Sequence, residues 1–254
     1  MSASRPSEEP GAVAERVARS LAERGARAVA LVGSHSRGHA DAESDLDFAV
    51  IGEGPHYRLE TYDDWLISLG WATAEEQRQR LYEPSYLGTH VPGWREALVL
   101  HDPEGLAASI QREALEWSWN LVEDRCSAWI AEGITGYAEE AQRLGASLRA
   151  GRKTTAAVQR SILTLRLPRT LALHLRILYG TENELWDLVA DELGAPWRDA
   201  QSAALGLGGE SLDASCRAAL RLFALAATEV GQHLDDRQLA VVEHALRRVR
   251  PESP

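Results

Sequence analysis

The sequence has few of the residues that mark several large classes of protein. Only two cysteines occur among 254 residues, Cys126 and Cys216. They are too few and too far apart for a disulfide framework or a CxxC zinc site, so we expect two buried free thiols. No apolar run approaches the ~18–20 residues that a membrane-spanning helix needs. The first residues lack the apolar core of a secretory signal. We therefore expect a soluble, cytoplasmic protein with no membrane partner.

Basic residues are also scarce. Lys153 is the only lysine, and 27 basic residues stand against 38 acidic ones, for a formal net charge of -11. Because nucleic acid backbones are bound by basic side chains, we do not expect a nucleic acid partner. Residues 1–104 alone carry 18 acidic and 10 basic side chains. This balance favours a small cationic substrate, whereas an anionic one needs a local positive site or metal ions.

The spacing of apolar residues changes near residue 104. Before it, the pattern predicts short elements: a helix at 11–24, strands at 30–32 and 47–51, a hairpin of 58–62 with 65–71, a helix at 75–81 and a strand at 97–102. After it, apolar residues three and four apart predict helices near 106–131, 133–149, 154–166, 169–179, 183–193, 212–231 and 235–249, with a flexible loop at 203–209. We expect two domains, an α/β unit at 1–104 and a helical bundle at 105–254.

One segment combines features that phosphate chemistry needs. Gly33 and Ser34 follow the strand at 30–32, and Asp45 and Asp47 open the next strand. A Gly-Ser pair straight after a strand lets the backbone approach a ligand and aims N–H groups and a hydroxyl at phosphate oxygens. Two carboxylates two residues apart on a strand share a face and repel unless a cation lies between them. Such hard oxygen ligands suit Mg²⁺ carried with a nucleoside triphosphate.

The run GSHSRGHADAESDLDFAV at 33–50 resembles the DNA polymerase β-like nucleotidyltransferase superfamily. The motif of that superfamily is a strand, Gly-Ser, a loop, and Asp-x-Asp on the next strand. The form here is similar to the bacterial branch that includes the kanamycin and streptomycin nucleotidyltransferases and the minimal nucleotidyltransferases. The resemblance implies an α+β fold: a mixed sheet with helices, followed by an all-α helical-bundle domain.

The resemblance also implies a reaction and a site. A nucleoside monophosphate, expected to be AMP from ATP, would pass to a hydroxyl of a small molecule such as an aminoglycoside-like antibiotic, with Mg²⁺ as cofactor and pyrophosphate as product. Asp45 and Asp47 would be the catalytic metal ligands. The residues expected to bind the nucleotide are Gly33, Ser34, Arg37 and Ser44.

Two positions depart from the family pattern. Ser68 stands where a later strand is expected to supply a third carboxylate, and the acidic residues within 60–64 lie at or across the neighbouring turn. Gly136 stands where the kanamycin-type enzyme has its general base. Glu132 and Glu139 lie about one turn to either side and are the candidates for that role.

Two alternative functions remain open at this point. Ser68 and Gly136 favour a protein of this fold that has lost catalysis and serves as a binding or regulatory module. A toxin-like nucleotidyltransferase that acts on RNA or protein is the other alternative, because Arg247, Arg248 and Arg250 form a small basic cluster.

Overall fold

The computed structural model describes residues 9–41 and 43–249 and contains two compact units. The first comprises the described residues up to Val122 together with Leu178–Thr181. The second comprises Glu123–Ile177 and the described residues from Glu182 onward. The first unit extends past residue 104, where the spacing of apolar residues changes. The reason is that the next helix, Leu106–Glu116, still packs on the sheet and on the two helices before it.

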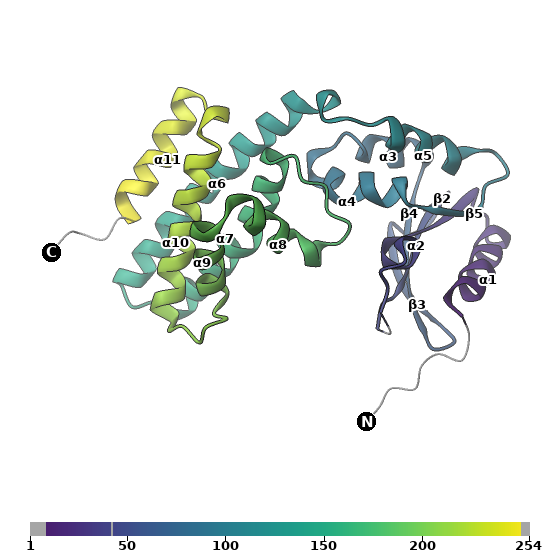
Figure 1. Ribbon diagram of the computed structural model, residues 1–254, viewed down its shortest axis with the longest axis horizontal. Coiled ribbons are helices and arrows are strands. Elements are labelled where there is room, and N and C mark those ends of the chain that lie inside the picture. Colours follow the sequence, from purple (N-terminus) through teal and green to yellow (C-terminus); the bar gives the residue numbers. More distant parts are fainter. Residues whose placement is uncertain (1–8, 42, 250–254) are drawn as a thin grey trace. The chain divides into compact units, whose positions relative to one another are not determined.

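The first unit is a five-stranded mixed sheet with helices (Figure 1). Its elements are α1 (Pro10–Glu23), β1 (Ala28–Val32), α2 (Gly33–Arg37), β2 (Leu46–Ile51), β3 (Tyr57–Tyr62), β4 (Trp65–Ala72), α3 (Ala74–Arg80), α4 (Pro84–Arg95), β5 (Leu98–His101), α5 (Leu106–Glu116) and a 3-10 turn, η1 (Trp119–Leu121). The strand order is β3-β4-β2-β1-β5. The β2–β4 pair is parallel and the other pairs are antiparallel. The expected hairpin is present, since Tyr62 pairs with Trp65 across the turn.

The two faces of the sheet differ in side-chain size. One face packs against Val13, Val17 and Leu21 of α1 and holds the large apolar residues, Val29, Leu31, Leu46, Phe48, Val50, Trp65, Ile67, Leu69 and Trp71. Because successive residues of a strand point to opposite faces, the intervening positions lie on the other face. They are mostly small, and they include Ala30, Ala49, Gly70, Asp47 and Ser68. Space for a ligand is therefore available on the face away from α1.

The second unit is helical. Its elements are α6 (Glu123–Arg149), α7 (Lys153–His174), α8 (Glu182–Leu193), α9 (Ala195–Leu205), α10 (Leu212–Glu229), a 3-10 turn, η2 (Gly231–His233), and α11 (Asp236–Val249). Leucine, isoleucine and alanine side chains fill the interior, with Ile134, Leu163 and Phe223 fully buried. Cys126 and Cys216 are buried free thiols, as expected. None of the helices in the described part of the chain is long and apolar enough to span a bilayer.

Several helix boundaries differ from the expected ones. Residues 33–37 form a helix rather than loop, and the loop at 203–209 begins only at Gly206, the C-cap of α9. The break expected near residue 132 is absent, since α6 is continuous. A Cβ at Gly133 would lie 3.3 Å from the Thr170 hydroxyl oxygen, so this glycine allows α7 to pack closely and does not end the helix.

Two prolines lie inside helices, and another segment supplies each missing hydrogen bond. Proline has no backbone N–H and leaves the carbonyl four residues earlier without its helical donor. For Pro168 in α7 that carbonyl belongs to Thr164, and Trp186 Nε1 lies 3.4 Å from it. For Pro92 in α4 it belongs to Gly88, and the Tyr179 N–H donates to it at 2.9 Å. The second contact fixes the returning segment Leu178–Thr181 to the first unit.

Candidate active site

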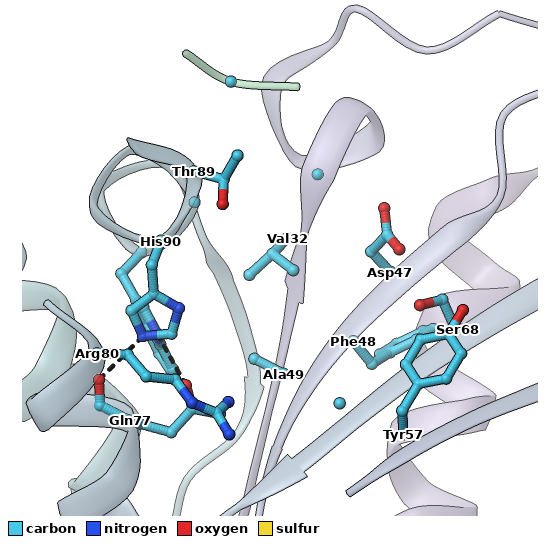
Figure 2. A pocket seen from close by; sticks show the side chains of 15 residues that line it. Val32, Asp47, Phe48, Ala49, Tyr57, Ser68, Gln77, Arg80, Thr89 and His90 are labelled. Carbon is cyan, nitrogen blue, oxygen red and sulfur yellow. Dashed lines mark hydrogen bonds between the residues drawn. The ribbon is translucent and has the colours of Figure 1, made fainter. Parts of the chain in front are cut away.

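A pocket of about 330 Å³ opens on the face of the sheet away from α1. The sheet wall includes Val32, Asp47, Ala49, Ser68 and Gly70 of β1, β2 and β4. The opposite wall comes from α3 and α4 and includes Gln77, Arg80, Thr89, His90, Gly93 and Trp94. Figure 2 shows Asp47 and Ser68 on one side, with Gln77, Arg80 and His90 facing them from the other. All of these residues, and Gly180 at the rim, belong to the first unit.

Gly33 lies directly against the Asp47 carboxylate. Val32 pairs with Asp47 across β1 and β2, so Gly33 follows at the end of β1 beside that side chain. A Cβ at Gly33 would lie 2.4 Å from Asp47 Oδ2, and the backbone has a φ of +78°. Both the contact and the conformation require glycine. The glycine bend and the second aspartate of the motif are thus in contact.

The environment of Asp47 disfavours its charged form. Burial, followed by repulsion from the neighbouring Asp45 carboxylate, raises the pKa of Asp47 to about 6. A hydrogen bond from Ser68, together with the charges of His35 and Arg37, acts in the opposite direction on this pKa. Ser68 pairs with Asp47 in the register of β2 and β4. The predicted position for a third carboxylate is therefore adjacent to Asp47, and a hydroxyl occupies it.

The two aspartates fit a divalent cation whose remaining ligands come from a bound molecule and water. Asp45 and Asp47 supply two carboxylates whose mutual repulsion a cation would relieve. Within residues 9–41 and 43–249 no group of three or more His, Cys, Asp or Glu side chains could hold a metal ion. A Mg²⁺ at this pair would need the remaining oxygens from a triphosphate and water.

The other expected nucleotide ligands do not line the pocket. Arg37 is tied to the protein: its side chain is only 8% exposed, it donates to the Gly180 carbonyl at 2.6 Å, and it lies 3.7 Å from Glu96. Ser44 exchanges hydrogen bonds with Asp41 in a local turn. Ser34 is half-buried and is also absent from the pocket lining. For these three residues nucleotide binding stays a prediction.

The candidates for the general base lie on α6 of the second unit. Glu132 and Glu139 are both exposed, and Glu139 forms an ion pair with Arg143 one turn later. Gly136 between them is exposed as well. Their role stays a prediction. The acidic residues at 60–64 contribute no pocket-lining side chain, since Asp63 pairs with Arg16 and Glu60 with Arg58.

The helix α4, which forms part of the pocket wall, is not among the elements expected from the sequence. Pro92, Gly88 and Gly93 lie within this helix and interrupt its pattern. The signal that indicates a helix is Leu87, Val91 and Trp94, which are spaced as on one helical face and are all buried. Pro84 at its start is a further indication.

The fold of the first unit is that of a nucleotidyltransferase domain. Residues 14–116 match the family model described as "Nucleotidyltransferase domain". The crystal structure of a nucleotidyltransferase-like protein from Exiguobacterium sibiricum is similar to this chain with a TM-score of 0.54 and 14% sequence identity, over 87% of this chain and 77% of that one. At this identity the likeness shows the fold. No curated protein matches the chain.

The comparisons confirm the predicted fold class, a mixed sheet with helices followed by a helical region. They support nucleotidyl transfer as the general activity, with a nucleoside triphosphate as substrate. The antibiotic branch of the superfamily stays a prediction.

Proposed function

We propose that this protein transfers a nucleoside monophosphate, with ATP as the expected donor, to a hydroxyl group of a small molecule. The acceptor oxygen forms a bond to the α-phosphorus, and the bond from that phosphorus to the α,β-bridging oxygen breaks. Pyrophosphate leaves, and the hydroxyl proton passes to a base. The observation that carries the proposal is the packing of Gly33 on the Asp47 carboxylate at the pocket wall, where the charge of Asp45 also acts on Asp47.

The chain's own residues have distinct tasks in this proposal. Asp45 and Asp47 hold the divalent cation that accompanies the triphosphate. When bound, Mg²⁺ neutralises charge on the triphosphate and lowers the barrier to deprotonation of the acceptor. Gly33 lets the backbone approach the phosphates next to Asp47. Glu132 and Glu139 are the candidates to accept the proton.

Neutral variants of the two aspartates test the proposal. Pyrophosphate release from Mg·ATP is measured with a panel of hydroxyl-bearing acceptors, and amino sugars belong in the panel because the net charge of -11 favours a cationic acceptor. Metal-ion stabilisation is worth several kcal/mol, so Asp45→Asn and Asp47→Asn should each lower the rate about 100-fold or more. Asp64→Asn is the matched control, since Asp64 is an exposed carboxylate in the hairpin turn. Full turnover by either site variant would refute the metal assignment.

A second candidate function is a nucleotide-binding module without catalysis. The specific observation in its favour is Ser68 in the register position beside Asp47, where a third carboxylate is expected. Such a protein would bind a Mg²⁺ complex of a non-hydrolysable ATP analogue, yet release no pyrophosphate with any acceptor. A slow release that is lost in Asp47→Asn would instead support the enzyme. The alternative of a toxin-like enzyme that acts on RNA or protein stays a prediction. Arg247 of its basic cluster pairs with Glu243, and Arg250 lies outside the described residues.

A further inference from the structure

The wall of the pocket formed by α3 and α4 has no task in the chemistry proposed for the aspartates, yet it is firmly built. Gln77 of α3 is 2% exposed and joins the two helices. Its backbone carbonyl accepts a hydrogen bond from His90 Nε2 at 2.9 Å, and its side-chain Oε1 accepts one from Trp94 Nε1 at 3.3 Å. Arg80 lies three residues after Gln77 and shares its face of the helix. The helix pair therefore presents Arg80 to the pocket in a defined place (Figure 2).

Arg80 is held by neutral groups. Its guanidinium donates to His56 Nε2 at 3.0 Å and lies over the Tyr86 ring at 5.3 Å from the centroid. Arginine has no acceptor, so His56 Nε2 must accept this bond. Among the described residues no carboxylate forms an ion pair with Arg80. Glu76, one turn earlier, directs its carboxylate to the backbone N–H and hydroxyl of Thr73 in a capping box. The charge of Arg80 contributes to the lowered pKa of Glu76, but the two side chains form no ion pair.

This arrangement is unusual for the chain, in which many arginines pair with acidic side chains. Arg78, two residues earlier on the same helix, lies 3.5 Å from Glu113 and donates to Ser109. In a protein with a net charge of -11, an arginine that lines a pocket and forms no ion pair among the described residues can direct its donors to an anionic ligand.

No other cation lines the pocket in the described part of the chain. His90 is neutral near pH 7, because burial lowers its pKa to about 4. Its Nε2 carries the proton that is donated to Gln77, which leaves Nδ1 as an acceptor. The α3–α4 wall thus combines one positive charge with neutral polar groups. An amine at this wall would meet the like charge of Arg80, whereas an oxyanion would find a fork of donors.

We propose that the ligand at the α3–α4 end of this pocket carries a phosphate or carboxylate group, which Arg80 binds. This inference rests on the proposed function, because it assigns the substrate class of the same pocket. At this wall it places an anionic group and not the amine of an amino sugar. Two sources can supply the oxyanion, the triphosphate tail of the nucleotide or an anionic acceptor.

Calorimetric titration of the full chain tests the inference. The probes are ribose 5-phosphate, ribose as its neutral counterpart, and kanamycin as a polycationic amino sugar. We expect ribose 5-phosphate to bind more tightly than either of the others. Arg80→Gln should weaken its binding about tenfold or more, and Arg80→Lys should retain part of the affinity. Arg19→Gln is the matched control, because it removes one charge from an exposed arginine of α1 that pairs with Glu15.

A second titration, with the Mg²⁺ complex of a non-hydrolysable ATP analogue present, separates the two sources. If the analogue displaces ribose 5-phosphate and itself binds Arg80→Gln about tenfold more weakly, the oxyanion belongs to the triphosphate. If both ligands bind together, it belongs to the acceptor. The inference is overturned if the wild-type chain binds neither ribose 5-phosphate nor the ATP analogue. It is also overturned if Arg80→Gln melts like the wild type and binds both phosphate ligands as tightly as the wild type does. Since binding is measured without transfer, these results do not depend on whether the chain is catalytic.

Discussion

Substitution of Gly33 by alanine tests whether the glycine bend positions the Asp47 carboxylate. The added Cβ would lie 2.4 Å from Asp47 Oδ2 and 3.2 Å from the Asp47 Cβ and Cγ atoms. An ordinary contact is at least about 3.4 Å, so the carboxylate must shift by roughly 1 Å. A shift of that size costs about 100-fold in a catalytic rate. We expect Gly33→Ala to lose Mg·ATP-dependent pyrophosphate release by about this factor, and to bind Mn²⁺ more weakly in calorimetry.

The matched control is Gly38→Ala. Gly33 and Gly38 have φ values of +78° and +71°, but a Cβ at Gly38 meets nothing within 4 Å. Alanine in this left-handed region costs about 1–2 kcal/mol of folding stability at either position. Gly33→Ala should lose about 1 kcal/mol more, because Asp47 leaves its preferred rotamer. Urea unfolding measures both. Equal losses of stability and of activity in the two variants would refute the reasoning.

Two further predictions concern residues beside the same pocket. The pKa of His90 is about 4 in the folded protein, against 6.5 in the unfolded chain. Because the unfolded chain therefore binds more protons as the pH falls, His90 alone should lower the free energy of unfolding by about 2 kcal/mol from pH 7 to pH 5. His90→Gln should remove that loss. Urea unfolding of wild type and variant at both pH values measures it as a difference between the two proteins, because the raised pKa of Asp47 changes the stability of both in the opposite direction. Ser68→Asp places a carboxylate beside Asp47; calorimetry should show Mn²⁺ affinity about tenfold or more higher, with the metal-free protein about 1 kcal/mol less stable. Unchanged affinity in Ser68→Asp would contradict the position assigned to the third ligand.

The half of the site that lies on strands could be predicted from the sequence. Period two places Asp45 and Asp47 on one face, and the resemblance to the superfamily places Ser68 where a third metal ligand is expected. The contact of Gly33 with Asp47 also needs the pairing of β1 with β2, which periodicity within one strand does not give. The half that lies on α4 could not, because Gly88, Pro92 and Gly93 usually indicate the end of a helix.

The same limitation explains the helix boundaries of the second unit. Whether Pro168 ends a helix depends on whether another group donates to the Thr164 carbonyl. That donor is Trp186, which is far from Thr164 and Pro168 in the sequence. Gly133 is helical because Thr170 packs against it. Such tertiary partners are invisible to a local pattern. The position of Arg80 is a further case, because its neighbours His56 and Tyr86 come from other segments of the chain.

The segment Leu178–Thr181 has a consequence for the order in which the protein forms during translation. The Tyr179 N–H donates to the Gly88 carbonyl, which Pro92 leaves without its helical donor. Gly180 lines the pocket, and its carbonyl accepts a hydrogen bond from Arg37. These residues emerge from the ribosome only after Glu123–Ile177 has been made. Domains encoded by one uninterrupted stretch can fold as soon as that stretch is exposed. Here the last residues of the first unit are made late, so a nascent chain halted before residue 178 has all five strands but lacks the Gly180 part of the pocket lining.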